Sequence, residues 1–339
     1  MRRNAAWFAT PVLFLAAAAC GEAQSPAPAV RDIAITKADR AAAIDALTKE
    51  LTAAYVFPAK AAEMDQALQR HVASGVYDTV TSAKAFAELL TGQLQAVTND
   101  KHLRVRVASP DAGGNPASWS SASRLRAARE DNYGFGRSEV LPGNIAYLEI
   151  RSFGSWAPEA RDSVSRIMSR LADADALIID IRGNGGGSPE VVAFVSSYLF
   201  GEAPVHLNSL YFRPANETTD FYTDPNVPGR KFGPTKPVYV LTSSRTFSAA
   251  EEFTYNLQTR HRAMIVGETT GGGAHPGGMV PVGSHLVAFI PSGRAINPIT
   301  KTNWEGVGVK PEIAVPREKA LDAALEAARR KVTRPGLPH

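Results

Sequence analysis

The run ALIIDIRGNGGG, residues 176–187, decides the class of fold. Its first six positions are almost continuously apolar, as expected for a strand buried on both faces of a parallel sheet. Glycines follow at once, and a helix-like stretch covers 190–199. Outside this run, a helical pattern covers 159–172, and strand-like stretches lie at 145–150, 238–241, 264–266 and 286–290. This alternation predicts an α/β core with a largely parallel sheet.

The segment before this core has a helical pattern. Residues 37–97 carry apolar side chains at helical spacing, for example Ile44, Leu47 and Leu51, which predicts a small helical domain. A strand at 103–107 follows, and the polar stretch 109–123, rich in Gly and Pro, is expected to be a loop. The predicted division is a signal peptide at 1–19, a tether at 20–36, the helical domain at 37–97, the α/β core at 98–316, and a C-terminal helix and tail at 317–339.

The N-terminus has the pattern of a secretory signal. Arg2 and Arg3 precede an apolar run, residues 5–19, which is too short for a good transmembrane helix. Cys20 follows three alanines and is the only cysteine in the chain, which excludes an intrachain disulfide. Its position resembles the lipobox of bacterial lipoproteins, in which the cysteine becomes the lipidated N-terminus. We therefore expect a bacterial cell-envelope protein, a periplasmic lipoprotein anchored to the membrane through Cys20. An ordinary signal peptide with an incidental cysteine is the alternative.

The composition narrows the class of partner. The chain has 339 residues and a formal net charge of +4, and its basic residues are spread rather than gathered in a dense run. A nucleic-acid partner is therefore not expected. A single cysteine disfavours a zinc–cysteine site. The chemistry considered below needs no metal or cofactor, and none is expected.

Ser248 lies in the run TSSRTFSAAEE, residues 242–252, between a strand-like and a helix-like stretch. At such a turn a serine hydroxyl is exposed beside the free N–H groups of the helix start, which suits a nucleophile with an oxyanion site. The alternative is structural. Ser248 and Glu251 have the S-x-x-E spacing of a capping box, in which the serine only caps the helix.

The glycine turn at 183–187 is a second candidate site. Glycines after a strand let the backbone approach a ligand closely and point N–H groups at an anion, which suits an oxyanion or a phosphate. Gly183 and Gly185 also match the start of a dinucleotide-binding turn, but Ser188 stands where the third glycine belongs. A dinucleotide ligand is therefore disfavoured.

His102 and Glu305 are the candidates to assist a serine. His102 follows Asp100 at the entry to a strand, and histidine is the usual general base because its pKa lies near neutrality. The rate is then expected to fall in acid with a midpoint of roughly 6 to 7. Glu305 lies between Trp304 and Gly306 and could orient such a histidine. A structural histidine and a surface glutamate are the alternatives.

Five motifs, in chain order, resemble the family of tail-specific, or C-terminal processing, serine proteases. That family includes the tricorn protease core and the repeats of interphotoreceptor retinoid-binding protein. The motifs are D-x-H at 100–102, D-x-R-x-N-x-G-G at 180–187, T-S-x-x-T-x-S-A-x-E at 242–251, G-E-x-T-x-G at 267–272, and W-E-G-x-G-V-x-P at 304–311. Together they extend the resemblance over most of the chain, from about 44 to 315.

The resemblance implies an α/β core of the ClpP/crotonase spiral kind and a peptide or protein substrate. It implies Ser248 as nucleophile, His102 as general base and Glu305 as the acid that orients the histidine. The oxyanion would be held by the N–H groups of Ala249 and Gly186, and no metal or cofactor would take part.

Two departures from the family's pattern bear on the mechanism. Members with a Ser–Lys dyad carry a lysine after the G-E-x-T block, but residues 271–274 are Gly-Gly-Gly-Ala, so a Ser–His–Glu arrangement is favoured. The stretch between His102 and Asp180 is too short for a complete PDZ domain beside the start of the core. A non-catalytic lipid- or peptide-binding protein on the same fold is the alternative function, and the joint presence of Ser, His and Glu favours the enzyme.

Overall fold

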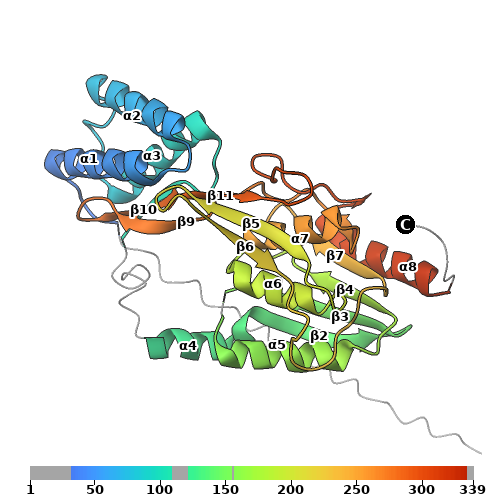
Figure 1. Ribbon diagram of the computed structural model, residues 1–339. Coiled ribbons are helices and arrows are strands. Elements are labelled where there is room, and N and C mark those ends of the chain that lie inside the picture. The colour runs from blue at the N-terminus through green and yellow to red at the C-terminus, as the bar shows by residue number, and fades with distance from the viewer. Residues whose placement is uncertain (1–31, 109–120, 155, 334–339) are drawn as a thin grey trace, which may run out of the picture. The chain divides into compact units, whose positions relative to one another are not determined.

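The computed structural model (Figure 1) describes residues 32–108, 121–154 and 156–333. The predicted signal peptide and Cys20 lie outside these residues. The helices are α1 (Lys37–Ala54), α2 (Pro58–Ala73), α3 (Ala83–Thr98), α4 (Ser121–Glu130), α5 (Pro158–Leu171), α6 (Pro189–Ser197), α7 (Ala249–Thr259) and α8 (Ala320–Thr333), with 3-10 turns η1 (Asn132–Gly134) and η2 (Arg317–Lys319). Within the described residues, no helix combines the length and the apolar character needed to cross a membrane.

The strands form three sheets. They are β1 (Arg104–Val107), β2 (Phe135–Leu141), β3 (Ile145–Ile150), β4 (Ala176–Asp180), β5 (His206–Phe212), β6 (Glu217–Tyr222), β7 (Val238–Thr242), β8 (Met264–Gly267), β9 (Gly277–Pro281), β10 (Leu286–Pro291), β11 (Gly293–Ile296) and β12 (Ile313–Ala314). The largest sheet has the order β12-β8-β7-β4-β3-β2 and is parallel except for the β2–β3 pair. This is the α/β core that the sequence predicted.

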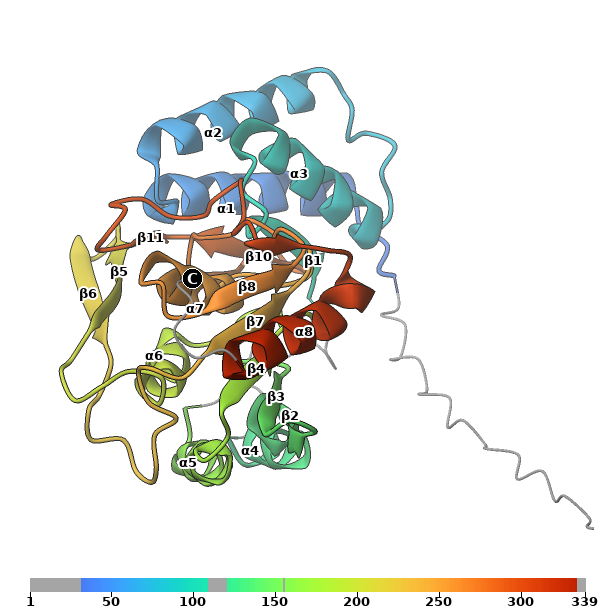
Figure 2. The same cartoon turned by 90° about the vertical axis from the view of Figure 1, so that its right-hand side faces the viewer.

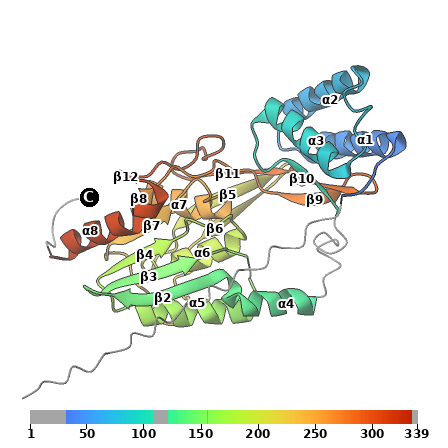
Figure 3. The same ribbon diagram turned by 180° about the vertical axis from the view of Figure 1, so that it is seen from behind.

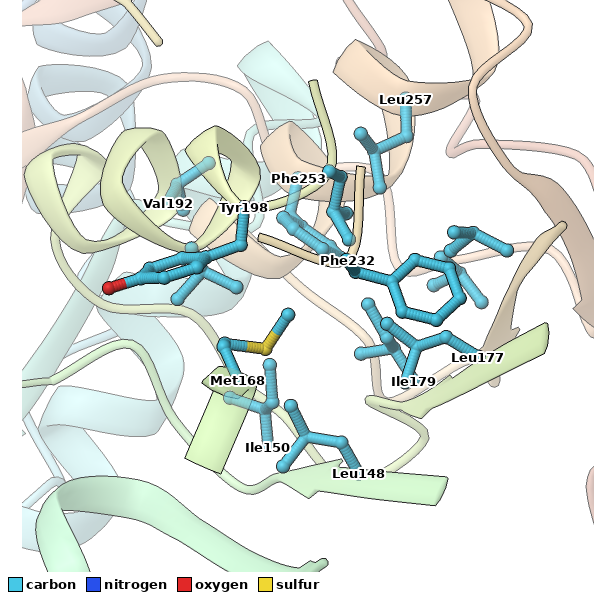
Figure 4. Close-up of a cluster of buried hydrophobic side chains, with 14 of the residues drawn as sticks. Leu148, Ile150, Met168, Leu177, Ile179, Val192, Tyr198, Phe232, Phe253 and Leu257 are labelled. Atoms are coloured by element: carbon cyan, nitrogen blue, oxygen red, sulfur yellow. The ribbon is translucent and has the colours of Figure 1, made fainter. Parts of the chain in front are cut away.

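The central strand β4 is buried on both faces because helices cover both sides of the large sheet. Leu177 and Ile179 point into the cluster formed with α5, α6 and α7, whereas Ala176 and Ile178 pack on the side covered by α8. Figure 2 shows α8 lying across one face of the sheet, and Figure 4 shows Leu177 and Ile179 among the side chains of the opposite cluster. The alternation of side chains along a strand accounts for this division.

The N-terminal helices pack on a separate antiparallel sheet, β1-β10-β9, as Figure 3 shows from behind. The sequence pattern counted 286–290 with the strands of the parallel core, and this placement is wrong. β10 pairs with β9 and β1 instead. Its alternate residues Leu286, Ala288 and Ile290 are buried in one cluster with α1, α2 and α3, so contact with the helices decides where this strand lies.

Several elements were not predicted. β5, β6 and β11 form a third antiparallel sheet. Helix α4 begins at Ser121, inside the stretch expected to be a loop. These elements matter for function because β5 and β11 contribute side chains to the surroundings of Ser248, as described below.

Candidate active site

Ser248 lies at the turn between β7 and α7 and is the N-cap residue of that helix. Its backbone has φ 57° and ψ −122°, a conformation with positive φ that residues with a side chain rarely adopt. A serine held in a tight strand-to-helix turn is the arrangement of the nucleophile elbow, which presents the hydroxyl beside the first N–H groups of the helix. The N–H of Ala249 makes no hydrogen bond within the described residues.

Glu251 fixes this turn through the arrangement of a capping box with Ser248. Its Oε2 accepts the N–H of Ser248 at 2.9 Å, which is the acidic half of such a box. The N–H of Glu251 also donates to the Ser248 carbonyl oxygen at 2.8 Å. The capping-box alternative is therefore present in the structure, and it is compatible with a hydroxyl that borders the cavity described below.

The same buried carboxylate ties the nucleophile turn to the loop after β8. Glu251 Oε1 accepts the hydroxyl of Thr270 at 2.5 Å and the N–H of Gly272 at 2.6 Å, and Oε2 also accepts the N–H of Gly273 at 2.8 Å. Burial raises the pKa of Glu251 while these donors oppose the rise. One side chain thus positions two segments that are distant in sequence.

We expect Glu251→Gln to destabilise the fold by about 3 kcal/mol, because an NH₂ group would face donors that now bind a carboxylate oxygen, and each buried donor left unpaired costs about 1–3 kcal/mol. Thermal unfolding measures this as a lower Tm. Glu326→Gln is the matched control, because Glu326 is exposed on α8 and its ion pair among the described residues is with Arg330 one turn away. Equal melting temperatures for the two variants would contradict the role of Glu251.

The glycine turn after β4 packs directly against Ser248. Asn184 holds it: its Nδ2 donates to the Ile150 carbonyl oxygen at 3.0 Å, and its Oδ1 accepts the N–H of Gly186 at 2.8 Å. An ideal Cβ at Gly186 would lie 2.8 Å from the Cβ of Ser248, and this glycine has φ 116°. Only glycine can bring the two turns so close.

The structure does not leave the N–H of Gly186 available for the predicted oxyanion site, because that N–H donates to Asn184. Gly187 is a better candidate for the oxyanion donor. The N–H of Gly187 makes no hydrogen bond within the described residues, and Gly187 lines the same cavity as Ser248. The sequence pattern located the turn but could not show which of its N–H groups an internal side chain would use.

His102 and Ser248 come together in one cavity of about 370 Å³, although they are far apart in sequence. The His102 ring lies between two phenylalanines, with its centroid 4.5 Å from that of Phe247 and 5.7 Å from that of Phe289. Both ring nitrogens are buried without a hydrogen-bond partner among the described residues. Burial lowers the pKa of His102 to about 4, although the charge of Asp100 opposes that shift.

Glu305 contacts a different histidine. Its Oε2 accepts the N–H of Ala274 at 2.5 Å and lies 3.5 Å from Nδ1 of His275, and no hydrogen bond joins it to His102. Burial, followed by the charge of Asp100, raises the pKa of Glu305 to about 7. The predicted pairing of Glu305 with His102 is thus absent as a direct contact.

Sequence reasoning missed His275, which is buried beside the predicted residues. Its Nδ1 lies 2.8 Å from Oδ2 of Asp100, and the same carboxylate accepts the hydroxyl of Tyr55 at 3.2 Å and, through Oδ1, the N–H of His102 at 3.0 Å. The available signal was its position two residues after the glycine run that faces Ser248 and His102.

Asp100, His275 and Glu305 are also the one set of possible metal ligands found among the described residues, with ligand atoms within 4.8 Å of one another. Most of these atoms already have protein partners. Nδ1 of His275, both Asp100 oxygens and Oε2 of Glu305 take part in the contacts given above, whereas Oε1 of Glu305 is buried without a hydrogen-bond partner among the described residues.

Each of the five motifs contributes residues to this site, for example His102, Gly187, Ser248, Thr270 and Trp304. Comparison with family models gives an independent assignment. A model of peptidase family S41 matches residues 144–315, and a model described as the N-terminal domain of peptidase family S41 in eukaryotic IRBP matches residues 29–130. The chain belongs to peptidase family S41. The first match contains Ser248, Ala249 and Glu305, and the second contains His102, so the resemblance seen in the motifs is confirmed.

Individual relatives fit the S41 family. A tail-specific protease of Haemophilus influenzae is 26% identical over 182 residues, which are 53% of this chain and 25% of that relative, so this chain spans about a quarter of the relative's length. A solved structure from Parabacteroides merdae has a TM-score of 0.59 at 19% identity, over 86% of this chain and 98% of the other. The structure of the photosystem II D1 C-terminal processing protease has a TM-score of 0.52 at 15% sequence identity, over 90% of this chain and 99% of the other. The two structures show that the fold is shared.

Proposed function

We propose that this S41 chain is a serine peptidase that hydrolyses peptide bonds in proteins or peptides. The observation that carries the proposal is the meeting of Ser248 and His102 in one cavity, with Ser248 at a turn of positive φ. The family match and the tail-specific relative support the same activity.

The proposed reaction is an acyl transfer through Ser248. Its Oγ attacks the carbonyl carbon of the peptide bond while His102 takes the hydroxyl proton. The tetrahedral oxyanion accepts the N–H groups of Ala249 and Gly187, and one such donor contributes about 3 kcal/mol to the transition state. Cleavage of the C–N bond releases an amine that takes the proton from His102, and water then hydrolyses the ester on Ser248 by the same route.

Glu305 enters this proposal as a positioning residue. Its carboxylate holds the N–H of Ala274, and the preceding Gly273 packs against the His102 ring, since an ideal Cβ on Gly273 would lie 2.6 Å from Cε1 of His102. Trp304 supports the same segment by donating its indole N–H to the Gly273 carbonyl oxygen at 2.7 Å. Glu305 would therefore orient the base through the backbone that the ring rests on.

A Ser–Lys mechanism finds less support. The residues that line the cavity with Ser248 include His102, Arg104 and Arg106 but no lysine. Lys101 is exposed, and its ammonium group donates to the Gly271 carbonyl oxygen. His102 is thus the better candidate for the base.

Labelling with a fluorophosphonate probe tests the function against the alternative of a lipid- or peptide-binding protein. A serine peptidase reacts covalently through its activated serine, and the modified peptide should contain Ser248. A binding protein on the same fold has no reason to activate that hydroxyl. Absence of labelling, together with absence of peptide cleavage, would favour the binding protein.

We further propose that the protein is exported and anchored as a lipoprotein through Cys20, because three alanines precede this cysteine and a proline-containing tether follows it. Mass spectrometry of the membrane fraction of a bacterial host is expected to show a mature chain that begins at lipidated Cys20. Cys20→Ser should move the protein out of that fraction. A product cleaved at another position, with Cys20 unmodified or missing, would refute the anchor.

A further inference from the structure

A small second pocket beside Ser248 is not used by the mechanism above. It has a volume of about 50 Å³ and shares Gly187, Ser248 and Pro276 with the larger cavity. Its remaining lining residues are Pro189, Leu210, Ala249, Glu252, Gly273, Ala274, Ala295 and Trp304. Because Ser248 and both proposed oxyanion donors border it, a group bound here would lie next to the carbonyl carbon under attack.

The pocket contains a buried carboxyl group. Glu252 lies one turn after Ser248 in α7, and its N–H donates to the Ser248 carbonyl oxygen at 2.9 Å. Residues four apart share one face of a helix, which explains why both line this pocket. The Glu252 residue is 5% exposed, and its Oε1 is buried without a hydrogen-bond partner among the described residues.

Two buried amides lie beside this carboxyl. Asn208 on β5 and Asn256 on α7 are fully buried, and within the described chain neither side-chain amide has a hydrogen-bond partner outside the cluster that they form with Glu252. Buried polar atoms are nearly always paired, so a polar cluster that has no partner beyond itself, next to a proposed nucleophile, requires an explanation. A ligand that brings its own hydrogen-bonding group to the exposed end of the cluster supplies one.

Burial favours the neutral form of this carboxyl. It raises the pKa of Glu252 to about 8, the charge of Glu190 adds to the rise, and hydrogen bonding from the amides of Asn208 and Asn256 opposes it. None of the ion pairs found among the described residues includes Glu252. A neutral carboxyl offers both an O–H donor and a carbonyl acceptor, which suits a hydroxyl or an amide group rather than an anion.

Size and walls limit the ligand further. A water-sized group needs roughly 10–15 Å³ of such space, so about 50 Å³ accommodates roughly three to five non-hydrogen atoms. The walls that flank Glu252 are apolar: Leu210, Ala274, Ala295 and the Trp304 ring. A short side chain with one polar end fits this shape, and a large aromatic or arginine side chain does not.

We propose that this pocket binds the side chain of the substrate residue whose carbonyl carbon Ser248 attacks, and selects a small uncharged side chain with a hydroxyl or amide group, such as threonine or asparagine. The inference rests on the proposed peptidase function. It assigns Glu252 as the residue that determines specificity, with Asn208 and Asn256 as its support.

Isosteric substrate pairs test the proposal. The peptides differ only at the selected residue. Threonine is paired with valine, asparagine is paired with leucine, and a lysine peptide provides a charged comparison. The wild-type enzyme is expected to cleave the threonine peptide with a kcat/KM about 10-fold or more above that of the valine peptide, because valine leaves the buried polar group unpaired. Glu252→Leu should abolish or invert this ratio, whereas Glu252→Gln, which keeps a donor and an acceptor, should preserve it.

Other outcomes overturn the proposal. A preference for lysine that disappears in Glu252→Gln would show an ion-pairing pocket instead. If Glu252→Leu fails to fold, Ala295→Val is the second variant: it narrows the pocket from β11 and should reduce cleavage of the threonine and asparagine peptides relative to an alanine peptide. An unchanged ratio in Ala295→Val, or in a folded Glu252→Leu, refutes the assignment. The exposed Glu326→Gln is the matched control and should keep the wild-type ratio.

Fluorophosphonate labelling separates failure of this proposal from failure of the peptidase function. Wild-type protein that is labelled at Ser248 and cleaves the threonine and valine peptides equally would remain a peptidase, and only the pocket would be refuted. Protein that is neither labelled nor able to cleave any peptide of the series would remove both proposals.

Discussion

Ser248→Ala is expected to abolish peptide hydrolysis while the protein stays folded. Removal of a catalytic serine lowers kcat by a factor on the order of 10⁴ or more, and the oxyanion donors that remain cannot supply a nucleophile. The Ser248 hydroxyl contributes at most a helix cap, so the free energy of unfolding should fall by no more than about 1 kcal/mol. The measurements are kcat/KM on a cleaved peptide and the Tm of both proteins.

Two neighbouring serines provide controls for this variant. Ser244 is exposed in the same turn, so Ser244→Ala should retain full activity. Ser243 is buried, and its hydroxyl donates to the Arg182 carbonyl oxygen at 2.6 Å, so Ser243→Ala should lower stability before it lowers turnover. Wild-type turnover by Ser248→Ala would refute the assignment and transfer the search for the nucleophile to these two residues.

The sequence was sufficient to predict the features that depend on neighbouring residues. The apolar run before Asp180 predicted a strand buried on both faces, and β4 is such a strand. The S-A-x-E run predicted a strand-to-helix turn, and Ser248 lies at one. Both predictions succeed because hydrophobic periodicity and glycine placement act over a few residues. The family resemblance extended them to the whole chain.

Features that depend on contacts between distant segments could not be predicted in the same way. The pattern at 286–290 predicts a strand, but only packing against α1, α2 and α3 decides that it joins β1 and β9. Likewise, Asn184 accepts the N–H of Gly186 because its side chain is held between that turn and the Ile150 carbonyl oxygen. The approach of His275 to Asp100, 175 residues away in sequence, has no local signal.

The pKa of the proposed base depends on burial in the same non-local way, and it sets the second large prediction. From the sequence alone, His102 is expected to titrate at roughly 6 to 7. In the structure its ring is enclosed by Phe247 and Phe289, and burial lowers its pKa to about 4. The neutral base is then present above about 4, so the rate limited by His102 should fall only as the pH drops through that value.

The same shift affects stability, so the assay must separate the two effects. The unfolded histidine takes up its proton near pH 6.5 and the folded one only near pH 4, which means that the unfolded state binds more protons between these values. The stability contributed by neutral His102 is therefore complete above about 6.5 and is lost as the pH falls toward 4. Initial rates after a rapid pH change, with unfolding followed in parallel, distinguish loss of the base from loss of the fold.

His102→Ala is expected to lower kcat by a factor on the order of 10³ or more, because a general base typically contributes 10²–10⁴-fold. Glu305→Gln should cause a smaller loss, since it acts through the segment at Ala274 rather than on the reacting atoms, and should leave the acid limb of His102 in place. His275→Asn tests the neighbouring histidine, whose Nδ1 is already paired with Asp100. If His102→Ala keeps most of its activity and His275→Asn is inactive, the base is His275, and the cavity shared by Ser248 and His102 would serve to bind substrate instead.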